Sequence, residues 1–264
     1  MKRKAERIAR SITSAISSWQ GVECVTLGEH SESDELDPHF ALVIDVYSEG
    51  EPPPTEERQA SFADAVGHPG AFESSGFQRK DRFFAEEIPL RVEYKSVTMI
   101  DDILGRIKAK DSTLFWIFKN SGTYMLYRLQ NSRILFQKSD WIKRVRHDIA
   151  HLPDFFWNGL HEAFVVKMEH YLADLGAASF GDDGYFYGVS MAGFTRYAVA
   201  SLFMANRKFE PSHRYISTRL RELKRLPDNF IGRWETLLRS GGGISEAQRY
   251  EVAELIAKSV LAFE

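Results

Sequence analysis

The stretch VECVTLGEHSESDELDPHFALVIDVY, residues 22–47, decides the fold. An apolar, β-branched run, Val22–Leu27, stops at Gly28, and an acidic, serine-rich segment leads to a second apolar run, Phe40–Tyr47. This pattern predicts two strands with an acidic loop between them. Gly allows close approach to a phosphate and carboxylates bind Mg²⁺, so the loop suits phosphate and metal chemistry. A solvated surface loop is the alternative interpretation.

Composition limits the class of protein. A chain of 264 residues, with 44% hydrophobic and 27% charged residues, predicts one large domain or two, and it excludes disorder for most of the length. The net charge of −3 gives no general attraction to nucleic acid. We therefore expect a nucleotide, bound at a local site, rather than an extended nucleic acid.

The single cysteine and the amino terminus indicate the compartment. Cys24 falls inside the first predicted strand, which excludes an internal disulfide framework and is typical of a reducing cytosol. The opening MKRKAERIARSI lacks the apolar run of a signal peptide, and no segment approaches the ~20 apolar residues of a membrane span. We expect a cytoplasmic protein with no membrane partner.

Hydrophobic periodicity predicts further elements in the first half. An amphipathic helix precedes the first strand, and Phe40–Tyr47 is apolar on both faces, which indicates a central strand. The connection Glu49–Gly76 is expected to contain one helix. The remaining expected elements are a helix at Arg3–Trp19, a helix at Thr55–Val66, a strand at Ile88–Val97 and a helix from Thr98, with Leu114–Phe118, Tyr124–Leu129 and Arg133–Phe136 unassigned.

After about Asp140 the pattern becomes helical, with few interruptions by Gly or Pro. We therefore predict two domains, residues 1–139 and 140–264, of which the second is an all-α bundle. Its expected helices are Trp141–His151, Asp154–Leu175, Asp183–Arg207, Ser212–Arg225, Asn229–Arg239 and Ser245–Ala262.

The order of elements resembles the nucleotidyltransferase superfamily, in particular small bacterial enzymes akin to those that modify aminoglycosides and lincosamides. Leu27-Gly28 matches the end of that family's first strand, although Glu29 replaces Gly or Ser. Asp37-Pro38-His39 stands where Asp-x-Asp is expected, and Glu93 matches the third carboxylate. The resemblance implies an α/β (α+β) domain with a mixed sheet, followed by a helical domain.

Segments in the second half extend this resemblance. Ser132–Phe136, followed by Gln137, is similar to the end of the family's catalytic domain, with Gln in place of Asp. The segment from Leu202 to Phe209, with Pro211 after it, and the Leu220–Leu223 and Arg225–Pro227 segments resemble its helical domain.

The resemblance implies a function and a set of site residues. Asp37, His39 and Glu93 would be catalytic residues and metal ligands, and Gly28, Glu29, His30 and Ser31 would face the nucleotide. The implied reaction transfers an NMP group from an NTP to a hydroxyl of a small molecule, with Mg²⁺ or Mn²⁺.

Two positions at which the sequence differs from the family's motifs favour a different hypothesis. Imidazole at His39 is a poor ligand for Mg²⁺, and Glu29 would repel phosphates. The alternative is therefore a catalytically degenerate fold that binds a nucleotide or a protein.

Asp45, ~20 Å along the strand from His39, is interpreted as a strand-end or loop residue. The sequence leaves a homodimer open.

Overall fold

The computed structural model describes residues 2–28, 42–239 and 243–263. The chain forms two compact units. The sheet unit comprises Met1–Arg106 and Leu126–His151, and the helical unit comprises Ile107–Met125 and Leu152–Glu264. Residues 107–125 thus group with the helical unit, and residues 140–151 with the sheet unit. The boundary between independently folding domains at 139 and 140 stays a prediction.

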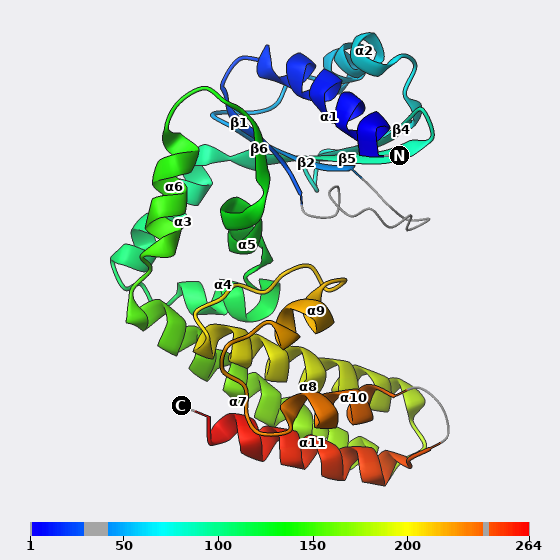
Figure 1. Ribbon diagram of the computed structural model, residues 1–264, viewed down its shortest axis with the longest axis vertical. Coiled ribbons are helices and arrows are strands. Elements are labelled where there is room, and N and C mark those ends of the chain that lie inside the picture. Colours follow the sequence, from blue (N-terminus) through cyan, green and yellow to red (C-terminus); the bar gives the residue numbers. More distant parts are fainter. Residues whose placement is uncertain (1, 29–41, 240–242, 264) are drawn as a thin grey trace. The chain divides into compact units, whose positions relative to one another are not determined.

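A mixed, six-stranded sheet forms the centre of the sheet unit (Figure 1). Its order is β3-β4-β5-β2-β1-β6. Strands β2 and β5 are parallel, and every other neighbouring pair is antiparallel. The strands are β1 (Val22–Leu27), β2 (Leu42–Ser48), β3 (Gly70–Ser75), β4 (Lys80–Ala85), β5 (Ile88–Ser96) and β6 (Arg133–Gln137).

The two strands of the opening stretch are confirmed. Strand β1 has the predicted bounds. Strand β2 lies between β1 and β5, and all of its residues are buried, as expected of a central strand. The predicted start of β2 at Phe40 lies outside the described residues. Strands β3 and β4 were not expected. The edge strand β3 is mostly exposed, so it lacks the hydrophobic alternation that would have indicated a strand.

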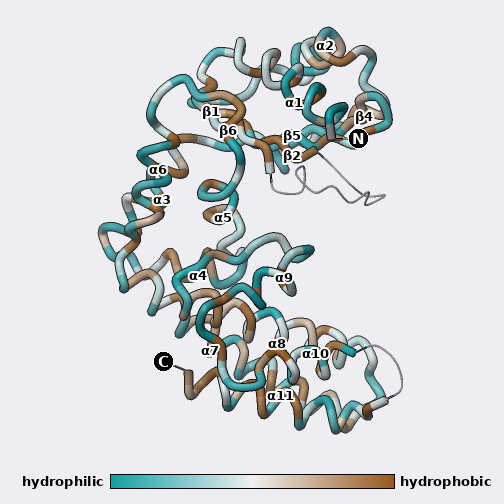
Figure 2. The backbone as a smooth tube through the Cα atoms, in the orientation of Figure 1, coloured by the Kyte–Doolittle hydropathy of each residue, from teal (hydrophilic) through white to brown (hydrophobic). Residues whose placement is uncertain are grey.

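Helices α1 (Lys2–Ser17) and α2 (Thr55–Val66) cover one face of the sheet (Figure 1). The predicted stripe on α1 is buried there, because Ile8, Ile12 and Ile16 pack into the core with the β-branched residues of β1 and β2. Figure 2 lets the reader follow these hydrophobic residues along the strands. We call this side the covered face.

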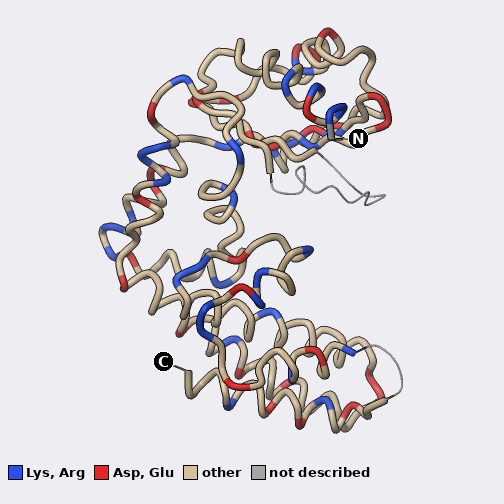
Figure 3. Tube along the Cα trace, in the orientation of Figure 1, with Lys and Arg blue, Asp and Glu red and all other residues tan. Residues whose placement is uncertain are grey.

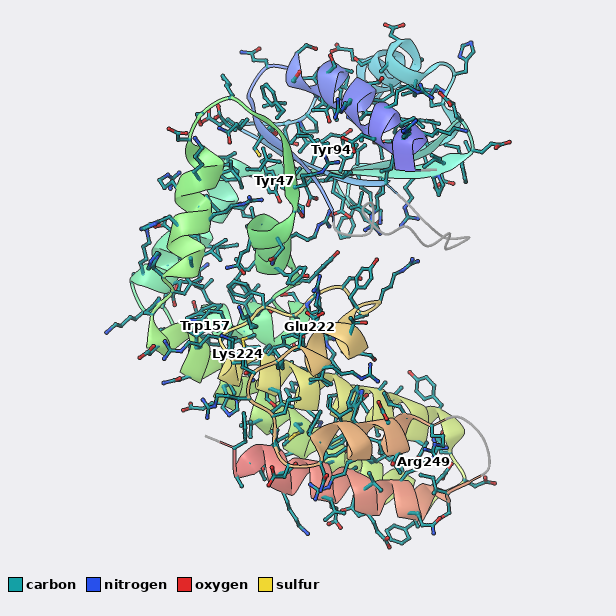
Figure 4. All side chains as sticks on the ribbon, in the orientation of Figure 1. Tyr47, Tyr94, Trp157, Glu222, Lys224 and Arg249 are labelled. Carbon is teal, nitrogen blue, oxygen red and sulfur yellow. The ribbon has the colours of Figure 1, made fainter. Side chains whose placement is uncertain are left out.

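An ion pair also lies within the covered face. Asp81 of β4 is fully buried and accepts hydrogen bonds from Arg58 Nε of α2 (2.8 Å) and from the hydroxyl of Tyr94 of β5 (2.5 Å). Because each partner belongs to a different element, the cluster joins α2 to the two strands. Tyr94, labelled in Figure 4, therefore points to the covered face, and Tyr47 on the neighbouring strand points to the opposite one.

Three more helices belong wholly or mostly to the sheet unit: α3 (Val97–Lys108), α5 (Tyr124–Asn131) and α6 (Trp141–Ala150). Trp141 Nε1 donates a hydrogen bond to Asp101 Oδ1 of α3 (3.1 Å), and its ring packs on Tyr47 at 5.4 Å between centroids. These contacts explain why α6 belongs to the sheet unit, although its sequence pattern continues into the helical half.

The second unit is helical, as the sequence predicted. Helices α7 and α8 pack along each other, and α11 packs against both (Figure 1). Close packing depends on small residues, since a Cβ at Gly193 of α8 would lie 2.3 Å from the ring of Tyr171 of α7. The helices are α4 (Leu114–Ser121), α7 (Asp154–Ala178), α8 (Gly184–Ala205), α9 (Ile216–Arg221), α10 (Phe230–Leu238) and α11 (Glu246–Leu261).

None of the helices in the described ranges combines the length and the apolar character needed to cross a membrane.

Candidate functional site

The predicted site residues fall into two groups. Glu29, His30, Ser31, Asp37 and His39 lie outside the described residues, so their roles stay predictions. Gly28 and Glu93 are described. The amide of Gly28 donates a hydrogen bond to the carbonyl of Val43 (2.8 Å), which continues the pairing of β1 with β2 by one residue.

Glu93 lies beside Asp45, a residue that the sequence analysis had set aside. The parallel register of β2 and β5 pairs the two positions, so both side chains leave the sheet on the face opposite α1 and α2. Asp45 is fully buried, and β2 continues beyond it to Ser48. The interpretation of Asp45 as a strand-end or loop residue is therefore wrong.

A single arginine bridges these two carboxylates. Arg128 of α5 places Nη2 2.5 Å from Asp45 Oδ1 and Nη1 2.6 Å from Glu93 Oε2. Lys95 Nζ lies 3.0 Å from the same Asp45 oxygen, and Arg91 Nε lies 2.9 Å from Glu93 Oε1. We call these five residues the acid–base cluster. It contains two acids and three bases, so its formal charge is positive.

The cluster favours the ionised form of Glu93. Burial alone would raise the pKa of Glu93, but Arg128, Lys95 and Arg91 hold it below its ordinary value. Tyr47 is held neutral, because burial and then the nearby charge of Asp45 raise its pKa well above the usual range. Its hydroxyl lies 3.5 Å from Asp45 Oδ2, and Lys95 Nζ lies 5.9 Å from its ring centroid.

The described residues do not by themselves form a metal centre. Within the described ranges, no three His, Cys, Asp or Glu side chains come together in a way that could hold an ion. Arg128 occupies one oxygen of Asp45 and one of Glu93, the two carboxylates that neighbour each other across β2 and β5. A divalent cation at these oxygens would meet the guanidinium charge directly.

Two more bases, Lys80 and Arg82, extend the positive charge of Arg91 along the sheet. Lys80 and Arg82 alternate with the buried Asp81 and Phe83, so they point to the face that carries Glu93. In the pairing of β4 with β5, Lys80 lies opposite Glu93 and Arg82 lies opposite Arg91. We call Lys80, Arg82 and Arg91 the cationic strip, and Figure 3 marks its Lys and Arg residues in blue.

The strip holds like charges close together. Burial, followed by repulsion from Arg82 and Arg91, lowers the pKa of Lys80. Among the described residues, neither Lys80 nor Arg82 has a salt-bridge partner, although Glu73 lies opposite Arg82 in the register of β3. Sequence analysis missed the strip because β4 was not recognised. The segment 80–85, KDRFFA, gives no hydrophobic alternation, because charged Asp81 takes a core position and apolar Phe84 an exposed one.

Comparisons with known proteins find matches among solved structures. No family model matches the chain, and no curated protein matches it. The chain is similar to the crystal structure of a nucleotidyltransferase-like protein from Exiguobacterium sibiricum, with 12% identity and a TM-score of 0.48. That match covers 97% of this chain and 74% of the other. The acid–base cluster and the cationic strip lie on the side of the sheet opposite the covered face, which we call the charged face. The functional inference depends on these residues.

Proposed function

We propose that this chain is a nucleotidyltransferase-like protein that binds a nucleotide at the charged face of its sheet without transferring it. One observation carries the proposal: the guanidinium of Arg128 bridges Asp45 and Glu93 on adjacent parallel strands. In metal-dependent transfer, neighbouring carboxylates hold a divalent cation. Arg is permanently charged and binds carboxylates through several donors, so here a side chain supplies the positive charge instead.

The cationic strip supports phosphate binding. Burial, and then repulsion from Arg82 and Arg91, lowers the pKa of Lys80, and a bound phosphate would relieve the repulsive part. Hydrogen bonds between ionised groups are about twice as strong as neutral ones, and Arg binds phosphate in a bidentate manner. The strip shares Arg91 with the acid–base cluster, and Lys80 pairs with Glu93 across the strands.

A second candidate function is the metal-dependent transfer of an NMP group from an NTP to a small-molecule hydroxyl. It is favoured by the position of Glu93, whose side chain is 22% exposed and lies next to Asp45. Asp37 and His39 would complete the ligands for Mg²⁺ or Mn²⁺. Metal would supply Lewis-acid stabilisation of the phosphates. This function requires Arg128 to release Glu93.

Calorimetric titration with ATP and GTP distinguishes the two functions. We expect binding that persists in EDTA, that weakens about tenfold or more in Arg82→Gln, and that does not change in Arg3→Gln, an exposed arginine of α1. We also expect no release of pyrophosphate with either metal. Binding that needs Mg²⁺ or Mn²⁺, is lost in Asp37→Ala and releases pyrophosphate would instead establish the transferase. Absence of nucleotide binding under all conditions would exclude both functions.

A further inference from the structure

An exposed aromatic side chain continues the line of the cationic strip. Phe84 follows Lys80 and Arg82 at the next alternate position of β4, so its ring leaves the sheet on the same face. It is 47% exposed, whereas Phe83 and Ala85 on either side of it are buried in the core. The core therefore does not account for an aromatic residue at position 84.

The neighbours of Phe84 leave its ring accessible and apolar. Across one side of β4 the paired residue is Gly70 of β3, and across the other side it is Pro89 of β5. Gly70 presents no side chain, and a Cβ built there would lie 3.6 Å from Phe84 Cβ. Any larger residue at position 70 would thus cover one flank of the ring.

Aromatic and cationic groups are therefore arranged in one line. Alternate residues of a strand are about 7 Å apart, which is comparable to the separation of base and phosphate in a nucleotide. Proteins that bind single nucleotides or single strands combine these two elements, with bases stacked on aromatic rings and phosphates held by Lys and Arg. On β4, Phe84 and Arg82 are adjacent members of such a line, and Arg91 lies across from Arg82.

We infer that Phe84 is the stacking platform for the base of the nucleotide, while Arg82, Arg91 and Lys80 contact its phosphates. The inference rests on the proposed function and adds that the protein recognises the base of the nucleotide as well as its phosphates. Because stacking uses the π-face that every base has, the site accepts different bases. Purines, with their larger ring area, bind more tightly than pyrimidines.

Titration with ATP and with tripolyphosphate separates base binding from phosphate binding. In Phe84→Ala, ATP should bind about 5- to 100-fold more weakly, and tripolyphosphate should bind as it does to the wild type. Phe84→Trp should retain ATP binding. Phe77→Ala is the matched control, because Phe77 is 99% exposed in the turn between β3 and β4, and it should leave both affinities unchanged.

Each other outcome has a defined meaning. Equal ATP affinity in Phe84→Ala and the wild type would overturn the platform, as would an equal loss of tripolyphosphate binding. If Phe84→Ala unfolds, Phe84→Leu, which keeps an apolar side chain without an aromatic face, replaces it with the same expectation. A wild type that binds tripolyphosphate as tightly as ATP overturns the platform alone. A wild type that binds neither ligand overturns the proposed function as well.

Discussion

Removing the guanidinium of Arg128 tests the acid–base cluster directly. Arg128→Met keeps most of the aliphatic stem but leaves Asp45, which is fully buried, with Lys95 at 3.0 Å as its remaining cation. Glu93 keeps Arg91 at 2.9 Å. Removing one partner of a buried ion pair costs about 3–5 kcal/mol. Because each carboxylate keeps at least one cation, we expect the lower end of that range, about 3 kcal/mol of unfolding free energy.

Urea unfolding, followed by circular dichroism, measures this loss in a double-mutant cycle with Asp45→Asn. Asn needs no counter-charge, so the double variant should be more stable than the sum of the two single changes predicts, by at least about 1 kcal/mol. Lys80→Met is the matched control and should stay within about 0.5 kcal/mol of the wild type. Additive single changes, or a loss in Arg128→Met no larger than in the control, would refute the reasoning.

Two further predictions concern the helical unit. Gly193→Ala should destabilise the protein by about 1–3 kcal/mol, because its Cβ would meet the ring of Tyr171, whereas Gly188→Ala, with open space around it, should be neutral or stabilising in the same unfolding assay. Burial raises the pKa of Glu210 despite hydrogen bonds from Thr123, so its contribution to stability is full below pH 4.5 and is lost as pH rises through the raised value. Glu210→Gln should remove the fall in stability that begins above pH 4.5, and an unchanged pH slope would contradict the assignment.

The sequence predicted elements with strong hydrophobic patterns. The bounds of β1 and α2 are confirmed. They were predictable because Val22–Leu27 is an apolar, β-branched run, and because prolines precede the helix Thr55–Val66 and Gly67 follows it. The β3–β4 hairpin was missed, since β3 is an exposed edge strand without a core pattern. Short segments such as α5 cannot be assigned to helix or strand from the sequence, because the two hydrophobic patterns are alike over so few residues.

The candidate site was predictable only in part, for a topological reason. The alternation of Leu90, Val92 and Tyr94 with Arg91, Glu93 and Lys95 predicts Glu93 on the non-core side of its strand, and the structure confirms that placement. Asp45 was excluded by its distance along the chain from His39. Its real neighbour is set by the parallel register of β2 with β5, which a single sequence does not give. Arg128 belongs to a helix that the sequence left unassigned, so its bridge between Asp45 and Glu93 could not be predicted.

The interleaving of the two units along the chain affects how the protein can be made and divided. The chain leaves the sheet unit after Arg106, returns at Leu126 and leaves again after His151. A ribosome therefore delivers β1 and β2 well before β6, whose pairing covers the outer edge of β1. Before β6 is synthesised, β1 has an unpaired edge that can pair with another chain and aggregate. Before Arg128 is synthesised, Asp45 lacks this ion-pair partner. A fragment that ends at residue 106 keeps both defects permanently, because Arg128 and β6 come later in the chain.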